Sequence, residues 1–505
     1  MAFLRLFWVQ LTSMRTALLL LLTLALVAIP GSLLPQRPVA PIRVNDWKLA
    51  NPAVADLYEA LGLFDVYGSP WFAAVYLLLT VSLIGCIVPR IQVYAKALRQ
   101  PPPRTPKRLD RLPASMSGTT DRSAEEALTA AEGVLKQKKF RVRREGDAVA
   151  AERGYLREFG NILFHLSFAL MLVGVAWNTL WSYKGEVIVV EGQAFSNNLT
   201  QYDDFSAGSA FKPANLQPFT IWVDTFTAKF ETGEVQRGAA RVFEADVRIA
   251  HADGASENAR IEVNHPLVVD GTQVHLIGHG YAPVVTVTDP NGDVAYQGPV
   301  VFLPQDGNFT SLGVIKAPDA RPNYLGFEGF FLPTAVVNEQ GPHSVFPDAL
   351  APELFVNVWT GAPREETGRP ESVYSLTKDG LEQMRTADGK VVTFRIAPGQ
   401  AIDLPDGSSL SFDDWRRWTK LQVSNEPGLW LVIGSVLLAV LGMMMSLYIR
   451  PRRLWLRVTE TPEGARVETG GLDRAESSVG LADDVAELAA SAGLVGVEQT
   501  QEVAP

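Results

Sequence analysis

Four long apolar runs constrain this chain more than any other feature of its sequence. They cover residues 16–34, 71–88, 159–181 and 428–449, and none of them contains a charged residue. Each run has about the 20 residues that a helix needs to cross a hydrocarbon layer of roughly 30 Å. Because a segment that faces lipid must satisfy its own backbone hydrogen bonds, we expect four membrane-spanning helices.

The first run could instead belong to a cleaved signal peptide, since Arg5 and Arg15 precede its apolar centre. Its apolar part is long, however, and residues 30–35 contain no small-residue cleavage site of the A-x-A kind. We therefore expect this run to be retained as a membrane span.

The basic residues predict how the spans are oriented. Arginine and lysine are dense in residues 89–158, and three arginines follow the fourth run directly. Basic residues favour the cytoplasmic side of a membrane, so we expect residues 1–15, 89–158 and 450–505 in the cytoplasm. Residues 35–70 and 182–427 then lie outside, at a plasma membrane or, for a plastid-derived chain, a thylakoid membrane.

The long outer segment, residues 182–427, is expected to be a β-rich domain. Short runs of β-branched and aromatic residues alternate there with clusters of Gly, Pro, Asn and Asp. This pattern predicts strands joined by turns, and so a β-sandwich or a distorted barrel. The expected fold is a polytopic membrane protein with four transmembrane α-helices and a large β-rich extracytoplasmic domain between helices three and four.

The cytoplasmic segments are expected to hold less structure. In the loop between the second and third runs, a Pro-rich linker is followed by a capping-box pair, Ser123 and Glu126, that predicts a helix. A Glu-Gly-Asp turn at residues 145–147 then predicts a hairpin, which completes a small αββ unit. The tail, residues 450–505, is acidic and rich in Gly and Ala, so we expect disorder with one short amphipathic helix over residues 481–494.

The composition excludes several classes of protein. The chain has 55 acidic and 45 basic residues, a formal net charge of -10, which argues against a nucleic-acid-binding protein. Its single cysteine, Cys86, excludes a disulfide framework, a Cys-rich zinc site and a CxxC redox pair. Cys86 lies in the second run, where a thiol behaves as a small apolar side chain. The common catalytic motifs are absent, so no catalytic residue is predicted.

One histidine, His165, lies inside the third run. Counted from Phe159, it is about 9 Å from the cytoplasmic end of that run. An ionisable side chain at this depth is costly, so it suggests a function, and neutral imidazole is a good axial ligand for haem iron. The alternative is a histidine that hydrogen-bonds a carbonyl or a Ser on a neighbouring helix. The residues alone leave both readings open.

The outer histidines suggest little chemistry. His275 and His279 are four residues apart, which in an uninterrupted strand places them on one face. A metal site would need a third ligand, such as His265 or His251, and a solvated strand face is the simpler interpretation. His343 has no obvious partner. The roles of His275 and His279 stay open.

Four short motifs occur in order along the chain. They are IPGSLLPQ at 29–36, the segment from SPWF at 69–72 to PR at 89–90, GNILFHLS at 160–167, and EPG at 426–428. In this order and topology, over roughly residues 14–456, the chain resembles the ResB/Ccs-type cytochrome c biogenesis proteins of the two-component haem-lyase system.

The resemblance implies a function in haem delivery. Proteins of this family pair with a ResC/CcsA-type membrane protein, and the complex moves haem b across the membrane and joins it to the CxxCH cysteines of apocytochrome c. A thioredoxin-like thiol reductant is a further implied partner. His165 matches the family's intramembrane histidine, an implied axial ligand of the haem iron, and the second ligand would come from the partner.

The chain lacks other parts that such a system needs. It contains neither the partner's Trp-rich haem motif nor a second histidine in its apolar runs, so the ligation chemistry is expected in the partner. Haem propionates need cations at the headgroup level, and Arg90, Arg153 and Arg157 are the candidates. The bias of basic residues toward the cytoplasm would also place them there without haem.

Two functions of other kinds remain open. The chain could be a membrane-anchored receptor whose outer domain binds a ligand, or an assembly factor that never contacts haem. The expected cytoplasmic segments contain no kinase, methyl-acceptor or DNA-binding module, which argues against the receptor.

Overall fold

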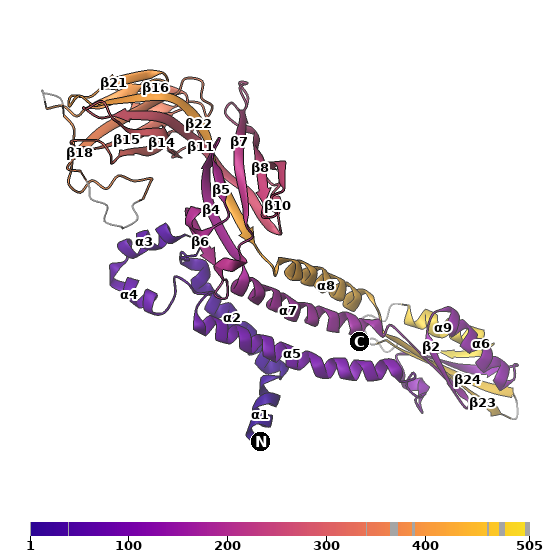
Figure 1. The fold of residues 1–505 in the computed structure, drawn as a ribbon. Coiled ribbons are helices and arrows are strands. Elements are labelled where there is room, and N and C mark those ends of the chain that lie inside the picture. Colours follow the sequence, from indigo (N-terminus) through magenta and orange to yellow (C-terminus); the bar gives the residue numbers. More distant parts are fainter. Residues whose placement is uncertain are drawn as a thin grey trace. The chain divides into compact units, whose positions relative to one another are not determined.

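The computed structural model describes residues 2–38, 40–339, 341–363, 372–385, 389–461, 464–473 and 480–499. The chain divides into two compact units, Met1–Trp177 with Gly428–Pro505, and Asn178–Pro427. The first unit contains the long apolar helices and a six-stranded sheet, whereas the second is built of strands (Figure 1).

Among the described residues, four helices are long and apolar enough to cross a membrane. They are α2 (Met14–Leu33), α5 (Pro70–Arg99), α7 (Leu156–Trp181) and α8 (Leu429–Tyr448). The prediction of four apolar helices, with a large β-rich region between the third and the fourth, is confirmed. Helix α5 continues beyond its apolar run through Pro89, because the residues that follow are mostly good helix formers.

Helices α7 and α8 pack against each other along small residues spaced seven apart. A Cβ added at Gly160 would lie 2.6 Å from the Cβ of Met445, and one added at Gly442 would lie 2.6 Å from the backbone N of Phe164. Small residues let helices in a membrane approach closely, and a seven-residue repeat keeps one face toward the partner. The repeat consists of Gly160, Ser167 and Gly174 on α7 and of Gly428, Ser435 and Gly442 at α8.

The segments on either side of α2 are also helical. They are α1 (Ala2–Leu11), α3 (Pro41–Ala50) and α4 (Pro52–Ala60). Just after α1, the carbonyl of Thr12 accepts a hydrogen bond from Cys86 Sγ at 2.9 Å, and the carbonyl of Leu11 accepts one from Ser82 Oγ at 2.6 Å. Cys86 therefore helps to hold the beginning of the chain against α5, in addition to its apolar packing.

The six-stranded sheet combines two distant parts of the chain. Its order is β2-β3-β23-β24-β1-β25, and its neighbouring strands are antiparallel. The strands are β1 (Ala114–Thr120), β2 (Arg141–Glu145), β3 (Ala148–Arg153), β23 (Arg452–Thr461), β24 (Gly464–Asp473) and β25 (Val495–Gln499), with helices η1 (Leu109–Arg111), α6 (Ala124–Gln137) and α9 (Leu481–Ser491). We call this assembly the six-stranded domain.

The six-stranded domain both confirms and corrects the sequence predictions. The capping box at Ser123, the helix α6, the hairpin β2–β3 and the helix α9 are present. The prediction of a disordered tail is wrong for its described residues. Leu454 and Leu456 of β23 are buried with Val485 of α9, and this apolar burial, which the low average hydrophobicity of the tail conceals, orders the segment.

The Pro-rich segment before η1 lies on the sheet and is not a free linker. Leu109 is buried with Trp455. The Nε1 of Trp455 donates to the carbonyl of Pro103 at 3.4 Å, and Arg457 Nη2 donates to the carbonyl of Pro106 at 2.7 Å. Proline carbonyls accept hydrogen bonds although proline has no N–H to donate, so such a segment can lie along a sheet without extending it.

The second unit, which we call the large β domain, has two lobes that share two long strands, β11 and β22. Val274 and Val423 belong to one apolar core, whereas Val287 and Phe412 belong to the other. Trp418 lies where the strands pass between the lobes, and its buried Nε1 donates to the carbonyls of Tyr281 and Phe302, both at 3.0 Å.

The strands of the large β domain are β4 (Tyr183–Val190), β5 (Ala194–Ser196), β6 (Asp204–Ala207), β7 (Phe219–Phe230), β8 (Ala240–His251), β9 (Ser256–Glu262), β10 (Leu267–Val269), β11 (Thr272–Thr288), β12 (Val294–Pro299), β13 (Leu303–Pro304), β14 (Ser311–Ala317), β15 (Tyr324–Leu332), β16 (Ala335–Asn338), β17 (Gly341–Ser344), β18 (Glu353–Gly361), β19 (Leu381–Gln383), β20 (Thr393–Ile396), β21 (Gln400–Asp403) and β22 (Ser409–Asn425). Two short helices, η2 (Leu199–Gln201) and η3 (Pro213–Asn215), accompany them. The first lobe contains β4 to β10, and the second contains β12 to β21.

Candidate functional site

His165 lies on α7 and is oriented by its own helix. Its Nδ1 is 2.8 Å from the carbonyl oxygen of Asn161, one turn earlier, and the ring of Phe164 meets it edge-on with centroids 5.6 Å apart. A carbonyl can only accept, so Nδ1 carries a proton, and in a neutral imidazole Nε2 then keeps its lone pair. Histidines that bind metals are commonly held in this way through the other ring nitrogen. His165 is thus arranged to offer Nε2 as a ligand.

The face of α7 that carries His165 is not the face that packs on α8. Ser167, in the small-residue repeat, is 1 % exposed and follows His165 by two residues, or roughly 200° of helix. His165 itself is partly exposed. Among the described residues, its hydrogen bond goes to its own helix and none goes to a neighbouring one. The side chain is therefore directed away from α8.

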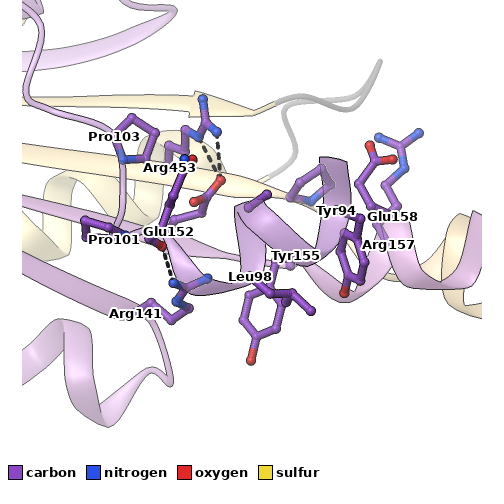
Figure 2. Close-up of a pocket in the computed structure, with 14 residues that line it drawn as sticks. Tyr94, Leu98, Pro101, Pro103, Arg141, Glu152, Tyr155, Arg157, Glu158 and Arg453 are labelled. Atoms are coloured by element: carbon purple, nitrogen blue, oxygen red, sulfur yellow. Dashed lines mark hydrogen bonds and ion pairs between the residues drawn. The ribbon is translucent and has the colours of Figure 1, made fainter. Parts of the chain in front are cut away.

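A cavity of about 290 Å³ lies where α5 ends and α7 begins (Figure 2). Three arginines line it, from the hairpin, from α7 and from β23, together with two tyrosines. The lining residues are Tyr94, Ala97, Leu98, Gln100, Pro101, Pro103, Arg141, Glu152, Gly154, Tyr155, Arg157, Glu158, Pro451 and Arg453. The cavity combines cations, carboxylates and aromatic surface at the end of two membrane-spanning helices.

The arginines of the cavity are held by defined contacts. Arg453 forms an ion pair with Glu152 at 2.8 Å, and Figure 2 shows their side chains joined. Arg141 donates to the carbonyl of Gln100, and its guanidinium lies 5.3 Å from the ring centre of Tyr155. The third arginine, on α7, donates through Nε to a backbone carbonyl of α8 at 3.2 Å. Arg453 is thus paired with a carboxylate that also lines the cavity.

Of the three predicted propionate contacts, the cavity contains Arg157 alone. Arg90 is an exposed residue of α5, and its Nη2 lies 3.6 Å from the sulfur of Met14. Arg153 points into the six-stranded domain, where its guanidinium is 4.7 Å from the ring centre of Phe140. The structure therefore does not bring the three arginines together.

Sequence reasoning missed Arg141 and Arg453 as members of this group. Arg453 was visible among the arginines that follow the last span, whereas Arg141 stands in a hairpin far from it in sequence. The two meet at the cavity because β2, β3 and β23 are consecutive strands of one sheet. No local pattern encodes that neighbourhood.

The premise that His275 and His279 share a strand face is wrong. Leu276 pairs with Leu421 and Gly278 with Lys420, so Ile277 is an extra residue in β11. A β-bulge of this kind shifts the alternation of side chains by one residue, which turns the two histidines to opposite faces. Groups of three or more His, Cys, Asp or Glu residues that could hold a metal ion are absent from the described part of the chain.

The outer histidines differ in their surroundings. His275 donates a hydrogen bond through Nε2 to Gln273 Oε1 at 3.1 Å, in keeping with a solvated strand face. His251 lies between Asp270 and Glu257, and the hydrogen bond to Asp270 raises its pKa. His279 instead packs among aromatic rings, where burial lowers the pKa of its imidazole to about 4. The expected solvated face is therefore wrong for His279.

Comparisons with known proteins agree over nearly the whole chain. The sequence model of the ResB-like family matches residues 14–485. A cytochrome c biogenesis protein CcsB of Synechococcus sp. CC9311 is 24% identical over 495 residues, which cover 96% of this chain and 97% of that protein. A second, from Synechococcus sp. WH7803, is 25% identical over 486 residues and covers 95% and 96%.

Proposed function

The chain belongs to the ResB-like family, and from this premise we propose that it is a subunit of a cytochrome c biogenesis complex that moves haem across the membrane. The observation that carries the proposal is the state of His165. Its Nδ1 is fixed on the carbonyl of Asn161, and Nε2 is left with a lone pair at a position within an apolar span. The relatives named CcsB support a role in cytochrome c biogenesis. His165 provides a side chain that can bind haem iron.

His165 would hold the haem iron from one side. A neutral imidazole needs no proton loss to bind iron, and its fixed orientation lowers the entropy lost on binding. His165 is the one histidine within the four apolar runs, so the second axial ligand would come from a separate protein in the membrane. A ResC/CcsA-type partner fits this role, since the sequence offers no other histidine in its spans.

The cavity at the ends of α5 and α7 is the proposed receiving site for haem propionates. Arg157 lies in the first turn of α7, eight residues before His165 and about 12 Å from it along the helix axis, which separates a carboxylate contact from an iron contact. Arg141 and Arg453 add positive charge to the same cavity. Arg90 and Arg153, which the cavity does not contain, are weaker candidates.

The proposed topology follows from charge and from pairing. The pairing of β3 with β23 requires the loop and the tail to lie on one side, and their density of arginine and lysine favours the cytoplasm. The large β domain then lies outside, where apocytochrome c is joined to haem. We assign the ligation chemistry to the partner and reduction of the cysteines to a thioredoxin-like protein.

Co-expression with a ResC/CcsA-type partner, purification and a visible spectrum test the ligand assignment. We expect a bound haem whose Soret band weakens at least fivefold in His165→Ala, because one axial ligand is lost. His165→Met, which keeps a weaker iron ligand, should retain haem with a shifted spectrum. An identical spectrum in wild type and His165→Ala contradicts haem ligation and leaves the receptor or assembly-factor alternative.

Two arginine variants test the cavity. Arg157→Gln should lower the haem content of the purified complex about two- to fivefold, because a propionate contact at the cavity is lost. Arg15→Gln is the matched control, since it removes the same charge from an exposed arginine that does not line the cavity and is not a predicted propionate contact. Equal losses of haem in the two variants contradict a specific role of the cavity. They would indicate that the general positive charge on this side of the membrane supports haem binding.

A further inference from the structure

Helix α1 ends in a turn that packs closely against α5. The contact is so close that a Cβ added at Gly85 would overlap the side chain of Thr12. Ser13 is the N-cap of α2, and its extended backbone, with φ -85° and ψ 146°, interrupts the helix between α1 and α2. The chain therefore changes direction at this turn, and α1 is a separate helix (Figure 1).

Four side chains donate hydrogen bonds to the backbone carbonyls around this turn. Two of the donors belong to α5, and two are threonines of the turn and of α2. The pairs, with the donor first, are Thr12 and Trp8 at 2.8 Å, Thr16 and Gln10 at 2.7 Å, Ser82 and Leu11 at 2.6 Å, and Cys86 and Thr12 at 2.9 Å. Water would satisfy such carbonyls at an aqueous surface, whereas an unpaired carbonyl is costly in an apolar layer. The turn is therefore suited to an apolar environment.

The two donors on α5 show at which level of the membrane span the turn lies. Ser82 and Cys86 belong to the uncharged run 71–88, six and two residues before its end. At about 1.5 Å per residue, the turn lies roughly 3–9 Å from the end of that run. Helices that lie in a membrane interface bury their apolar side roughly 5–10 Å into the boundary between headgroups and acyl chains. α1 leaves the turn at this level.

α1 has the composition of a helix that lies at a membrane surface. Of its ten residues, only Arg5 and Gln10 are polar. Phe3 is 77 % exposed and Phe7 is 55 % exposed, and these two side chains are one helical turn apart. Arg5 is two residues from each of them, or roughly 200° of helix, and so lies on the other side. Trp8, also exposed, is a residue type enriched at membrane interfaces.

We propose that α1 is an interfacial helix whose partner is the lipid bilayer. The side of Phe3 and Phe7 lies among the acyl chains, and Arg5 lies at the headgroup phosphates. This inference uses the membrane spans alone and does not depend on haem binding. Because interfacial residues help to set the tilt and rotation of a span, α1 and its turn would fix how α2 and α5 stand in the membrane.

Quenching of a fluorescent probe measures the depth of α1 in the full-length protein, reconstituted into vesicles of phosphatidylcholine with a minor share of phosphatidylglycerol. Cys86 is the single cysteine, and Cys86→Ser keeps a hydroxyl donor for the turn. In this background, Phe7→Cys and Arg5→Cys are made separately and labelled. A lipid nitroxide near the headgroup should quench the probe at residue 7 at least threefold more than one near the chain end. Iodide in the water should quench the probe at residue 5 at least threefold more than that at residue 7.

Phe3→Asp tests the apolar side of α1. Its charge, one turn before residue 7, should release the helix from the bilayer, so iodide should quench the probe at residue 7 at least threefold more. Val9→Asp is the matched control, because it adds the same charge four residues after Arg5, on the side of the headgroups. It should leave the quenching unchanged. Protection of the amide hydrogens of α5 verifies that the spans remain folded.

The other outcomes contradict the proposal. Equal quenching by iodide at residues 5 and 7 would place α1 in water. Strongest quenching of residue 7 by the nitroxide near the chain end would make α1 a part of the span. A probe at residue 7 that neither iodide nor the lipids quench would be covered by protein, either a second copy of the chain or another subunit.

Discussion

The two β-rich regions of this protein are built in opposite ways. The large β domain is one continuous segment, and its long strands β11 and β22 lie within it. The six-stranded domain takes three strands from before α7 and three from after α8. The first is complete in itself, whereas the second exists only when two distant parts of the chain meet.

The interiors of the two regions also differ. In the large β domain, Tyr281 packs on Phe331 with ring centres 5.2 Å apart, and aromatic rings fill the junction of the lobes. In the six-stranded domain, Arg452 is 6 % exposed and bonds Asp473 at 3.0 Å and also Asp484. Lys138 bonds the same Asp484 at 2.8 Å. A buried charge cluster thus links the loop to the tail.

Ending the chain after Pro451 should have the largest effect on the difference between the two regions. The variant removes β23, β24, α9 and β25, so β1 loses both neighbours and β2–β3 becomes an isolated hairpin, which is marginal in water. We expect amide hydrogens of β1 to β3 to exchange at unprotected rates, whereas those of β22 stay protected. Continued protection of β1 to β3 would show that the loop folds alone.

Arg452→Met should have the next largest effect. The variant removes the buried cation that Asp473 and Asp484 share, and breaking a buried ion pair costs about 3–5 kcal/mol. Denaturant dependence of hydrogen exchange should show this loss in the six-stranded domain alone. Arg466→Met is the control on β24. Its ion pair with Glu468 is long, at 3.9 Å, and exposed, so it should cost under about 1 kcal/mol.

Lowering the pH should change the folding stability of the two regions differently, and by a smaller amount than Arg452→Met. Because the folded pKa of His279 is about 4 and its ordinary value is 6.5, the unfolded chain binds more protons between these values. The large β domain therefore loses stability as pH falls from 6.5 to 4, by an amount on the order of 3 kcal/mol. His251 opposes this weakly, since its raised pKa adds stability at low pH that fades as pH rises.

The six-stranded domain should respond at lower pH. Burial acts in the other direction, but hydrogen bonds from Lys138 and Arg452 hold the pKa of Asp484 below its ordinary 3.8. Its contribution is therefore present above that value and is lost only as pH falls through the lowered pKa. Region-resolved hydrogen exchange between pH 7 and 4 measures the response of the large β domain, and its extension below the lowered pKa of Asp484 measures that of the six-stranded domain. His279→Phe should flatten the profile of the large β domain, and an unchanged profile would show that other groups control it.

The sequence predicted the features that depend on nearby residues. The four spans follow from uninterrupted apolar runs, and α6 follows from a capping box in which Ser123 and Glu126 bond each other's backbone. The His165 assignment depended on one polar residue in an apolar run, together with the family resemblance. Its hydrogen bond to Asn161, four residues earlier, is also local.

The features that the sequence did not predict depend on distant pairing or on one inserted residue. β24 has few large apolar side chains, and its place in the sheet is set by β1 and β23. The cavity needs Arg141 and Arg453 from different strands. The separation of His275 from His279 depends on Ile277 alone, and a single bulged residue leaves no mark in composition or periodicity.

The order of strands in the six-stranded sheet has a consequence for how the protein is made. β1 leaves the ribosome long before β24 and β25, the two strands that flank it. Three strands must therefore wait, incompletely paired, until the last span has been inserted and the tail released on the same side. A chain that stops early, or that inserts one helix the wrong way, cannot close this sheet and keeps an open edge for proteases. The folded sheet therefore forms only after the tail has been synthesised and the helices have been inserted in the correct orientation.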